Sequence, residues 1–368
     1  MNRSSSSIFS IEPDRVIEAG VRGGVIVSAD QQFVAVIPRE QAGNKIEIFR
    51  DATKISEFEV RLSPHASWQF AQSHEILVST EQSQICFWSF DGKLVHSVQF
   101  SATTEPDTSF ISSCFNRQGD FFCLAPQTTH MDSFEVGVWT ADTPLERLGR
   151  WEHASDVQKF DVGTGGCIYG TKRNERIFTV QGDGHGGEPL MFDTSVESER
   201  IVLKEAFGER MIFRDCCCWP CETSIAVVEG CPTAVRIFSL PGYQPKPQKL
   251  VWPFHPGDVN YDIDCMSSCD FVNDDLLAIQ TEHGRLHLIS TKSMQLVGEL
   301  ETPRFPLQPD TFNPNIPLKS PLGDIWRYRD KHLMVAYNTY LWQKSKAPTT
   351  LAFLPVDAIA QAVGENSR

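Results

Sequence analysis

The chain has 368 residues, of which 41% are hydrophobic and 22% charged, so it is long enough to bury a large core. Its 47 acidic and 33 basic residues give a formal net charge of -14, and no dense run of Lys or Arg occurs. This balance argues against nucleic acid as a partner, because binding to phosphates requires clustered positive charge. No segment approaches the roughly 20 apolar residues of a membrane-spanning helix, and none resembles a secretory signal.

The eleven cysteines are an odd number, and most fall within apparent strands. A free cysteine in such a position behaves as a small buried hydrophobic residue. Reduced thiols are typical of proteins inside the cell. We therefore expect a cytoplasmic or otherwise intracellular protein without a membrane span.

One short pattern recurs seven times: a large apolar residue, a bulky anchor residue and a polar residue, followed by turn-forming residues. Short apolar runs bounded by Asn, Asp, Gly or Ser are typical of β-strands. Because the anchors are regularly placed among apolar neighbours, we interpret them as core positions and not as a stacking platform for a ligand. The copies are Ile48-Phe49-Arg50, Phe87-Trp88-Ser89, Val138-Trp139-Thr140, Met191-Phe192-Asp193, Ile237-Phe238-Ser239, Leu288-Ile289-Ser290 and Leu341-Trp342-Gln343.

Consecutive anchors lie between 39 and 53 residues apart. A repeat of roughly 40 to 50 residues is typical of β-propeller blades. One such unit is too small to cover both of its faces, so several must pack side by side. The spacing predicts an all-β fold, a single seven-bladed β-propeller of four-stranded antiparallel blades.

Two repeats show all four strands of a blade. The second is expected to have strands at 67–71, 75–80, 84–90 and 93–100, and the sixth at 267–271, 276–281, 285–290 and 294–300. In the second repeat, Asp91-Gly92 predicts a two-residue hairpin turn of the primed type. Each set is a complete antiparallel meander.

The third repeat shows the same strand order, whereas the fourth and seventh are less regular. We expect the third at 112–115, 121–125, 134–140 and 145–151, the fourth at 167–170, 176–180, 190–192 and 200–204, and the seventh at 324–328, 332–337, 340–344 and 350–354. The N-terminal segment 15–19 can pair beside the seventh repeat. Such a strand would remove an exposed sheet edge.

The segments Phe87-Trp88-Ser89-Phe90-Asp91-Gly92-Lys93 and 267–278 resemble the WD-repeat family of propellers, and the resemblance extends over nearly the whole chain. No anchor forms a Trp-Asp pair, although Phe192-Asp193 is close to one, and no Gly-His pair opens a blade. The resemblance therefore implies a divergent WD-repeat-like propeller in which apolar packing replaces much of the family's histidine-aspartate hydrogen bonding. Paired glycines do not recur at one position, so the kelch family is a weaker match.

In this interpretation residues 1–14 are an N-terminal tail, 15–356 the propeller, and 357–368 a C-terminal tail or short helix. The longest connections share one face, which we name the long-loop face: 127–133, 181–188, 254–264 and the proline-rich 303–323. Long loops on a rigid scaffold commonly carry recognition. The candidate binding residues on this face are His130, Asp132, Asp183, His185, His255, Asp258, Arg304 and Asp310.

Several alternatives concern metal or redox chemistry. The His and Asp residues of the long loops suit a transition metal if three or four converge, but they lie on different blades, so a metal site stays open and no cofactor is predicted. Cys218-Trp219-Pro220-Cys221 has the spacing of a redox pair, yet it leads into a strand and not into a helix. Metal binding by Cys216, Cys218 or Cys221 with Cys265 and Cys269 is the other reading, although packing of small residues on the first strands explains them more simply.

The leading hypothesis is a noncatalytic scaffold that binds protein or peptide partners through the long-loop face and the blade edges. The alternative is a propeller enzyme, a lactonase-like hydrolase or metal-dependent lyase, with its site at the channel mouth. The sequence contains no phosphate-binding loop ending in Lys-Ser/Thr and no Gly-x-Ser-x-Gly elbow. Partner identity and oligomeric state are not specified by these patterns.

Overall fold

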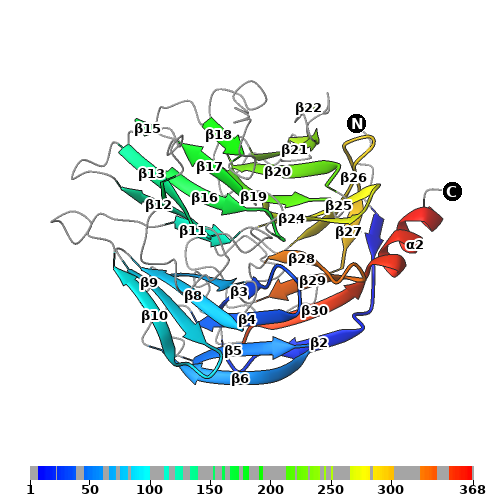
Figure 1. Ribbon diagram of the computed structural model, residues 1–368. Helices are drawn as coiled ribbons and strands as arrows, with labels where there is room; N and C mark the ends of the chain where they lie inside the picture. Colours follow the sequence, from blue (N-terminus) through cyan, green and yellow to red (C-terminus); the bar gives the residue numbers. More distant parts are fainter. Residues whose placement is uncertain are drawn as a thin grey trace, which may run out of the picture. The chain divides into compact units, whose positions relative to one another are not determined.

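The structure is a computed structural model of the chain (Figure 1). It has two compact units, one of residues 1–25, 36–43 and 213–368, the other of residues 26–35 and 44–212. The residues that it describes are 7–21, 23–38, 45–60, 66–71, 75–81, 84–99, 112–115, 121–126, 133–139, 152–153, 160–161, 166–173, 177–181, 190–193, 213–219, 222–230, 233–240, 244–245, 250–251, 266–281, 285–301, 324–337 and 348–366.

The described strands form seven sheets, each built from consecutive strands except where β1 (Ser7–Phe9) and β2 (Arg15–Glu18) join. Two sheets consist of a four-stranded meander alone. The first contains β3 (Gly23–Val27), β4 (Phe33–Pro38), β5 (Lys45–Arg50) and β6 (Thr53–Glu59). The second contains β7 (Ser67–Ala71), β8 (Ile76–Glu81), β9 (Gln84–Ser89) and β10 (Leu94–Gln99).

In the third and fifth sheets two short strands share the outermost position, and the fourth sheet has three described strands. The third sheet contains β11 (Ser112–Phe115), β12 (Phe121–Pro126) and β13 (Ser133–Trp139), with β14 (Glu152–His153) and β15 (Phe160–Asp161) both paired with β13. The fourth contains β16 (Gly166–Gly170), β17 (Ile177–Gln181) and β18 (Leu190–Asp193). The fifth contains β19 (Phe213–Cys218), β20 (Ser224–Gly230) and β21 (Thr233–Ser239), with β22 (Gln244–Pro245) and β23 (Leu250–Val251) both paired with β21.

The N-terminal strands β1 and β2 pair with the last two sheets. The sixth contains β24 (Met266–Asn273), β25 (Leu276–Thr281), β26 (Leu286–Ser290) and β27 (Gln295–Leu300), with β1 added in parallel to β27. The seventh contains β28 (Ile325–Tyr328), β29 (His332–Tyr337) and β30 (Thr350–Pro355), with β2 antiparallel to β30. The helix α2 (Val356–Asn366) follows β30 directly.

The strands of the second and sixth repeats lie within two residues of their predicted limits. The segment 15–19 does pair beside the seventh sheet, as predicted. The tail assigned to residues 1–14 instead contains a strand, because Phe9 finds a buried site against the sixth sheet. Of the third and fourth repeats, the predicted strands 145–151 and 200–204 lie outside the described residues; in the third sheet β14 and β15 occupy the fourth position.

The prediction that Leu341-Trp342-Gln343 lies in the third strand of the seventh sheet was wrong. β29 pairs directly with β30, and Leu354 lies opposite Leu333 just as Ile289 lies opposite Leu277 in the sixth sheet. The third strand therefore carries Phe353-Leu354-Pro355. The sequence concealed it because Trp342 matched the pattern better than a leucine followed by proline. Residues 338–347 lie outside the described part of the chain.

In three repeats the anchor and the residue before it are buried together. Ile48 and Phe49, Ile237 and Phe238, and Leu288 and Ile289 are all at most 5% exposed. Successive side chains of a strand point to opposite faces, so both faces of these sheets are covered. This is the burial pattern expected for the blades of a propeller.

The turn at Asp91-Gly92 is not of the primed type. Gly92 has a φ of 78°, whereas Asp91 is not among the described residues with positive φ. The backbone N–H of Gly92 donates to Ser89 O at 2.9 Å, so the turn runs from Ser89 to Gly92 and ends in a left-handed glycine. Positive φ at both central residues, which a type I′ turn requires, occurs instead at Asp51-Ala52 in the hairpin of β5 and β6.

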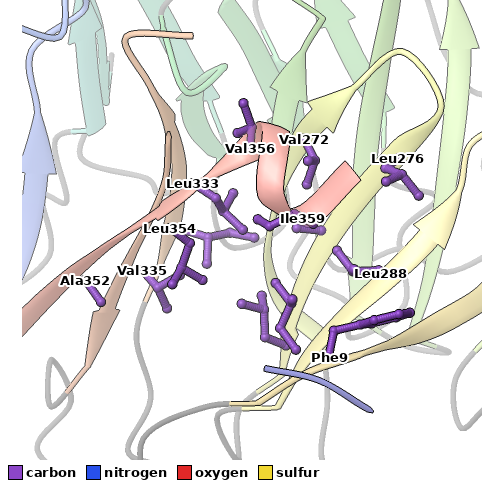
Figure 2. Packing of buried hydrophobic residues seen from close by; sticks show 14 of the residues in the cluster. Phe9, Val272, Leu276, Leu288, Leu333, Val335, Ala352, Leu354, Val356 and Ile359 are labelled. Carbon is purple, nitrogen blue, oxygen red and sulfur yellow. The ribbon is translucent and has the colours of Figure 1, made fainter. Parts of the chain in front are cut away.

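One apolar cluster joins the sixth and seventh sheets, β1 and α2 (Figure 2). The helix presents Val356, Ile359 and Val363 at helical spacing, and all three are buried in it. Phe9 from β1 is buried in the same cluster. The N-terminal strand and the C-terminal helix are thus anchored by shared apolar contacts.

Gly298 is the residue that lets β1 approach β27. A Cβ atom there would collide with the Phe9 ring and the Ser7 carbonyl oxygen. We expect Gly298→Ala to lower the free energy of unfolding by about 1–3 kcal/mol, the usual cost of overpacking. Denaturant unfolding measures this change, and hydrogen exchange at Ile8 and Phe9 should accelerate as β1 detaches.

The matched control is Gly364→Ala in α2, where an added Cβ has no atom within 4 Å. Because alanine is favoured over glycine in a helix, this variant should keep or gain stability by up to about 1 kcal/mol. Equal unfolding midpoints for Gly298→Ala and the unmodified chain would contradict the packing of β1 described above.

Candidate functional site

Polar side chains connect the first strands of the last three sheets, β19, β24 and β28. Asp215 on β19 accepts hydrogen bonds from the hydroxyl of Ser268 at 3.0 Å and from the backbone N–H of Cys269 at 2.9 Å, both on β24. The Ser268 hydroxyl oxygen in turn accepts the backbone N–H of Ile325 on β28 at 3.3 Å. A single buried hydroxyl therefore bridges three strands.

Asp270 makes a second connection between β24 and β28. Its Oδ2 accepts the backbone N–H of Arg327 at 2.6 Å, and its Oδ1 accepts that of Phe271 at 2.8 Å. The residue is only 3% exposed. Charge-assisted hydrogen bonds of this kind offset part of the cost of burying a carboxylate. We name Asp215, Ser268, Asp270 and Arg327 the first-strand network.

The Arg327 side chain is held from several directions and is 11% exposed. Its Nε donates to Asp330 Oδ1 at 3.2 Å, its Nη2 to the Asp330 carbonyl at 3.1 Å, and its Nη1 to the Val272 carbonyl. The guanidinium carbon lies 5.1 Å from the centre of a ring of Trp219, which meets Phe271 edge to face. Arg327 thus joins the fifth, sixth and seventh sheets.

The side chains of the first-strand network connect the first strands of adjacent sheets. A nucleophilic serine needs a neighbouring base such as histidine to take its proton. The Ser268 hydroxyl instead donates to the Asp215 carboxylate and accepts the backbone N–H of Ile325. The Arg327 guanidinium is likewise held by contacts within the chain.

The cysteines of β19 are packed in the interior. Cys217 and Cys269 are fully buried, with their Sγ atoms 3.5 Å apart. Burial, and then the hydrogen bond with Cys269, raises the pKa of the Cys217 thiol well above its usual value. A neutral thiol is a poor nucleophile and a poor metal ligand. This environment favours a packing role for both residues.

Cys218 is the first cysteine of the Cys-x-x-Cys segment, and it ends β19 in a buried position. β19 pairs with β20, and the Trp219 N–H donates to the Ser224 carbonyl at 2.8 Å. The next described element after Cys218 is therefore a strand. Cys221 and Cys265 lie outside the described residues, and among the residues that are described no group of three or more His, Cys, Asp or Glu is arranged to hold a metal.

The long-loop face cannot be assembled from the described part of the chain. All eight of its candidate residues lie outside that part: His130, Asp132, Asp183, His185, His255, Asp258, Arg304 and Asp310. Sequence reasoning did not identify the first-strand network. The sequence pattern that could have revealed this network is the presence of Asp215, Ser268 and Asp270 inside strands that are otherwise rich in small and apolar residues.

The outer edges of the sheets carry a different kind of surface. All the exposed large hydrophobic residues of the described chain lie on the outermost strands of their sheets, and they are between 44% and 65% exposed. We name them the outer-edge residues: Ile8 on β1, Val16 on β2, Ile55 on β6, and Leu94 and Val95 on β10. Exposed apolar side chains on edge strands are typical of sites where another chain adds a strand.

Comparison with known proteins supports the fold. The sequence matches no protein-family model, and a search of curated proteins finds no match. Among solved structures, the chain is similar to KlHsv2 with its loop 6CD replaced by a Gly-Ser linker, with a TM-score of 0.54 and 11% identity. The match covers 91% of this chain and 98% of KlHsv2.

The seven sheets and this similarity define the class: the protein is an all-β propeller. No helix in the described ranges has the length and apolar character needed to cross a membrane.

Removal of the Ser268 hydroxyl tests the first-strand network. Ser268→Ala leaves the Ile325 N–H without that acceptor and Asp215 without that donor, so we expect about 1–3 kcal/mol less free energy of unfolding. Chemical denaturation measures the change. The control is Ser293→Ala at an exposed turn, expected to stay within about 0.5 kcal/mol. Equal losses in the two variants would contradict a bridging role for Ser268.

Alkylation tests the environment of the cysteines. At pH 8 the native chain should leave Cys217 and Cys269 unmodified by iodoacetamide, because both are buried and the Cys217 thiol stays protonated. Peptide mass mapping before and after unfolding in guanidinium measures the modification at each site, with the partly exposed Cys86 as the internal comparison. Rapid native labelling of Cys217 would contradict its buried, protonated state.

Proposed function

We propose that this protein is a noncatalytic, WD-repeat-like interaction scaffold that binds protein or peptide partners through its long-loop face and its blade edges. One observation carries the proposal: the exposed large apolar side chains of the described residues are gathered on outermost strands. Apolar side chains exposed beside the unpaired backbone of an edge strand favour contact with a polypeptide. The first-strand network supports the same reading, since its polar groups connect sheets.

The long loops supply the proposed specificity. In the propeller KlHsv2, a loop was replaced by a Gly-Ser linker, and that structure still matches the present chain over 98% of its length. Loops of such a fold are therefore separable from its core. We propose that His130, Asp132, Asp183, His185, His255, Asp258, Arg304 and Asp310 make contacts with the partner.

We further propose that residues 15–356 form one propeller domain and that the protein is cytoplasmic or otherwise intracellular. The latter proposal rests on the odd number of cysteines, eleven, and on the burial of Cys217 and Cys269 as packing residues within strands. An oxidising compartment favours disulfides between neighbouring thiols, whereas the cytosol keeps them reduced.

Loop replacement tests the proposed function. We expect exchange of residues 303–323 for a Gly-Ser linker of equal length to reduce recovery of bound partners by roughly tenfold, because a few contacts carry most binding energy. Affinity capture from cell extract with quantitative mass spectrometry measures recovery. The thermal midpoint should be unchanged, since the core remains intact.

The control is the double variant Lys292→Ala and Ser293→Ala in the exposed turn between β26 and β27. It should recover partners as the unmodified chain does. Identical capture profiles for the unmodified chain, the linker variant and an equivalent replacement of 254–264 would contradict recognition by the long-loop face.

A further inference from the structure

A β-bulge recurs at one position in the outermost strand of three sheets. In each, one extra residue lies opposite the junction between the anchor and the residue before it. Ile55 is the extra residue opposite Ile48 and Phe49, and Val95 is the extra residue opposite Phe87 and Trp88. Val297 occupies this position opposite Leu288 and Ile289. All three bulged residues are β-branched and apolar, and such bulges commonly end or redirect pairing at a sheet edge.

In the sixth sheet a further strand uses the edge just beyond this bulge. β1 pairs in parallel with the three residues that follow Val297: Ser7 with Gly298, Ile8 with Glu299 and Phe9 with Leu300. The backbone N–H of Glu301 donates to the Phe9 carbonyl at 2.7 Å. Val297 is partly buried against the apolar cluster there. The chain thus shows how a short extended segment seats on an outer edge.

The corresponding edge of the second sheet is β10, which lies beyond β9 at the margin of its sheet (Figure 1). The residues equivalent to 298–300 are His96, Ser97 and Val98, because His96 pairs with Phe87 as Gly298 pairs with Leu288. Leu94 and Val95 before them are 50% and 46% exposed. Among the described strands, β9 alone pairs with β10. Within the described sheet, this edge combines an outermost strand with two neighbouring exposed apolar side chains.

We infer that the β10 edge is a docking site for an extended segment of a partner protein. The segment pairs its backbone with residues 96–98 and covers Leu94 and Val95 with apolar side chains. This inference rests on the proposed scaffold function and names one of its binding surfaces. A second copy of this chain is a poorer occupant, because each copy carries a formal net charge of -14 and like-charged chains repel.

The structure also specifies what the segment needs. β1 requires glycine at position 298 for the close approach of Phe9, whereas His96 stands at that position on β10 with its ring 6.1 Å from that of Phe87. The segment must therefore carry a small residue opposite His96. Lys93 and Asp91 beside the site form an ion pair at 2.6 Å, so their charges cancel and the contact depends on apolar burial and backbone hydrogen bonds.

Peptide selection on the full chain tests this inference. A displayed library of random ten-residue peptides is selected on the unmodified protein and counter-selected on the double variant Leu94→Lys and Val95→Lys. The enriched peptides are synthesised and titrated by calorimetry. Their binding should weaken roughly tenfold or more in the double variant, because the apolar contacts carry most of the binding energy. The affinity should change by less than about twofold between 50 and 500 mM salt, since net charge plays little part.

The matched control is Ser293→Lys, which adds the same charge at the exposed turn between β26 and β27 and should leave peptide affinity unchanged. Hydrogen exchange should show new protection of the backbone amides at 96–98 when peptide binds. Leu94→Ser with Val95→Ser repeats the comparison with a smaller perturbation, and melting curves verify that all variants fold.

Three results would overturn the inference: no enriched peptide, equal binding to both β10 variants and the unmodified chain, or a dimer in sedimentation that the β10 variants abolish. The last result would assign the edge to a second copy. Partner capture that depends on the long loops but not on Leu94 and Val95 would refute this site while leaving the scaffold function in place.

Discussion

Burial of both faces of each sheet is the constraint on which the rest of the structure depends. A blade has neighbouring residues of one strand pointing to opposite sides, and in this chain both members of pairs such as Ile237 and Phe238 are removed from water. No blade can achieve this alone, so every blade requires cover on both of its faces. This cover is supplied by two apolar clusters, one between the fifth and sixth sheets and one between the sixth and seventh.

The first and the outermost strands of the sheets carry different kinds of side chain. At the first strands the polar groups are buried, and they are satisfied there: the Ser268 hydroxyl donates to Asp215, while Ser268 and Asp270 accept backbone N–H groups of the next sheet. At the outermost strands one side of the backbone ladder ends, and apolar residues such as Leu94 remain exposed. Recognition is therefore proposed at edges and loops, where contact with a partner need not disturb the interior.

The sixth sheet shows how an edge can be completed by the chain itself. Residues 7–9 add a parallel strand, Gly298 provides room for Phe9, and α2 closes over the same cluster. The bulge that precedes this site recurs in two other sheets with exposed aliphatic residues. One local geometry is used for internal closure in one place and is proposed for external binding in another.

The sequence by itself determined the class of fold and most strand limits in the second and sixth repeats, because alternation and turn residues act over a few positions. It did not determine which segment fills the third strand of the seventh sheet: Trp342 matched the local pattern, whereas the register places Leu354 there. Only the tertiary structure decided that Phe9 is buried, that Arg327 is held within the chain and that Cys217 meets Cys269. These contacts join residues that are distant in sequence, and no local pattern encodes which distant partner a side chain will meet.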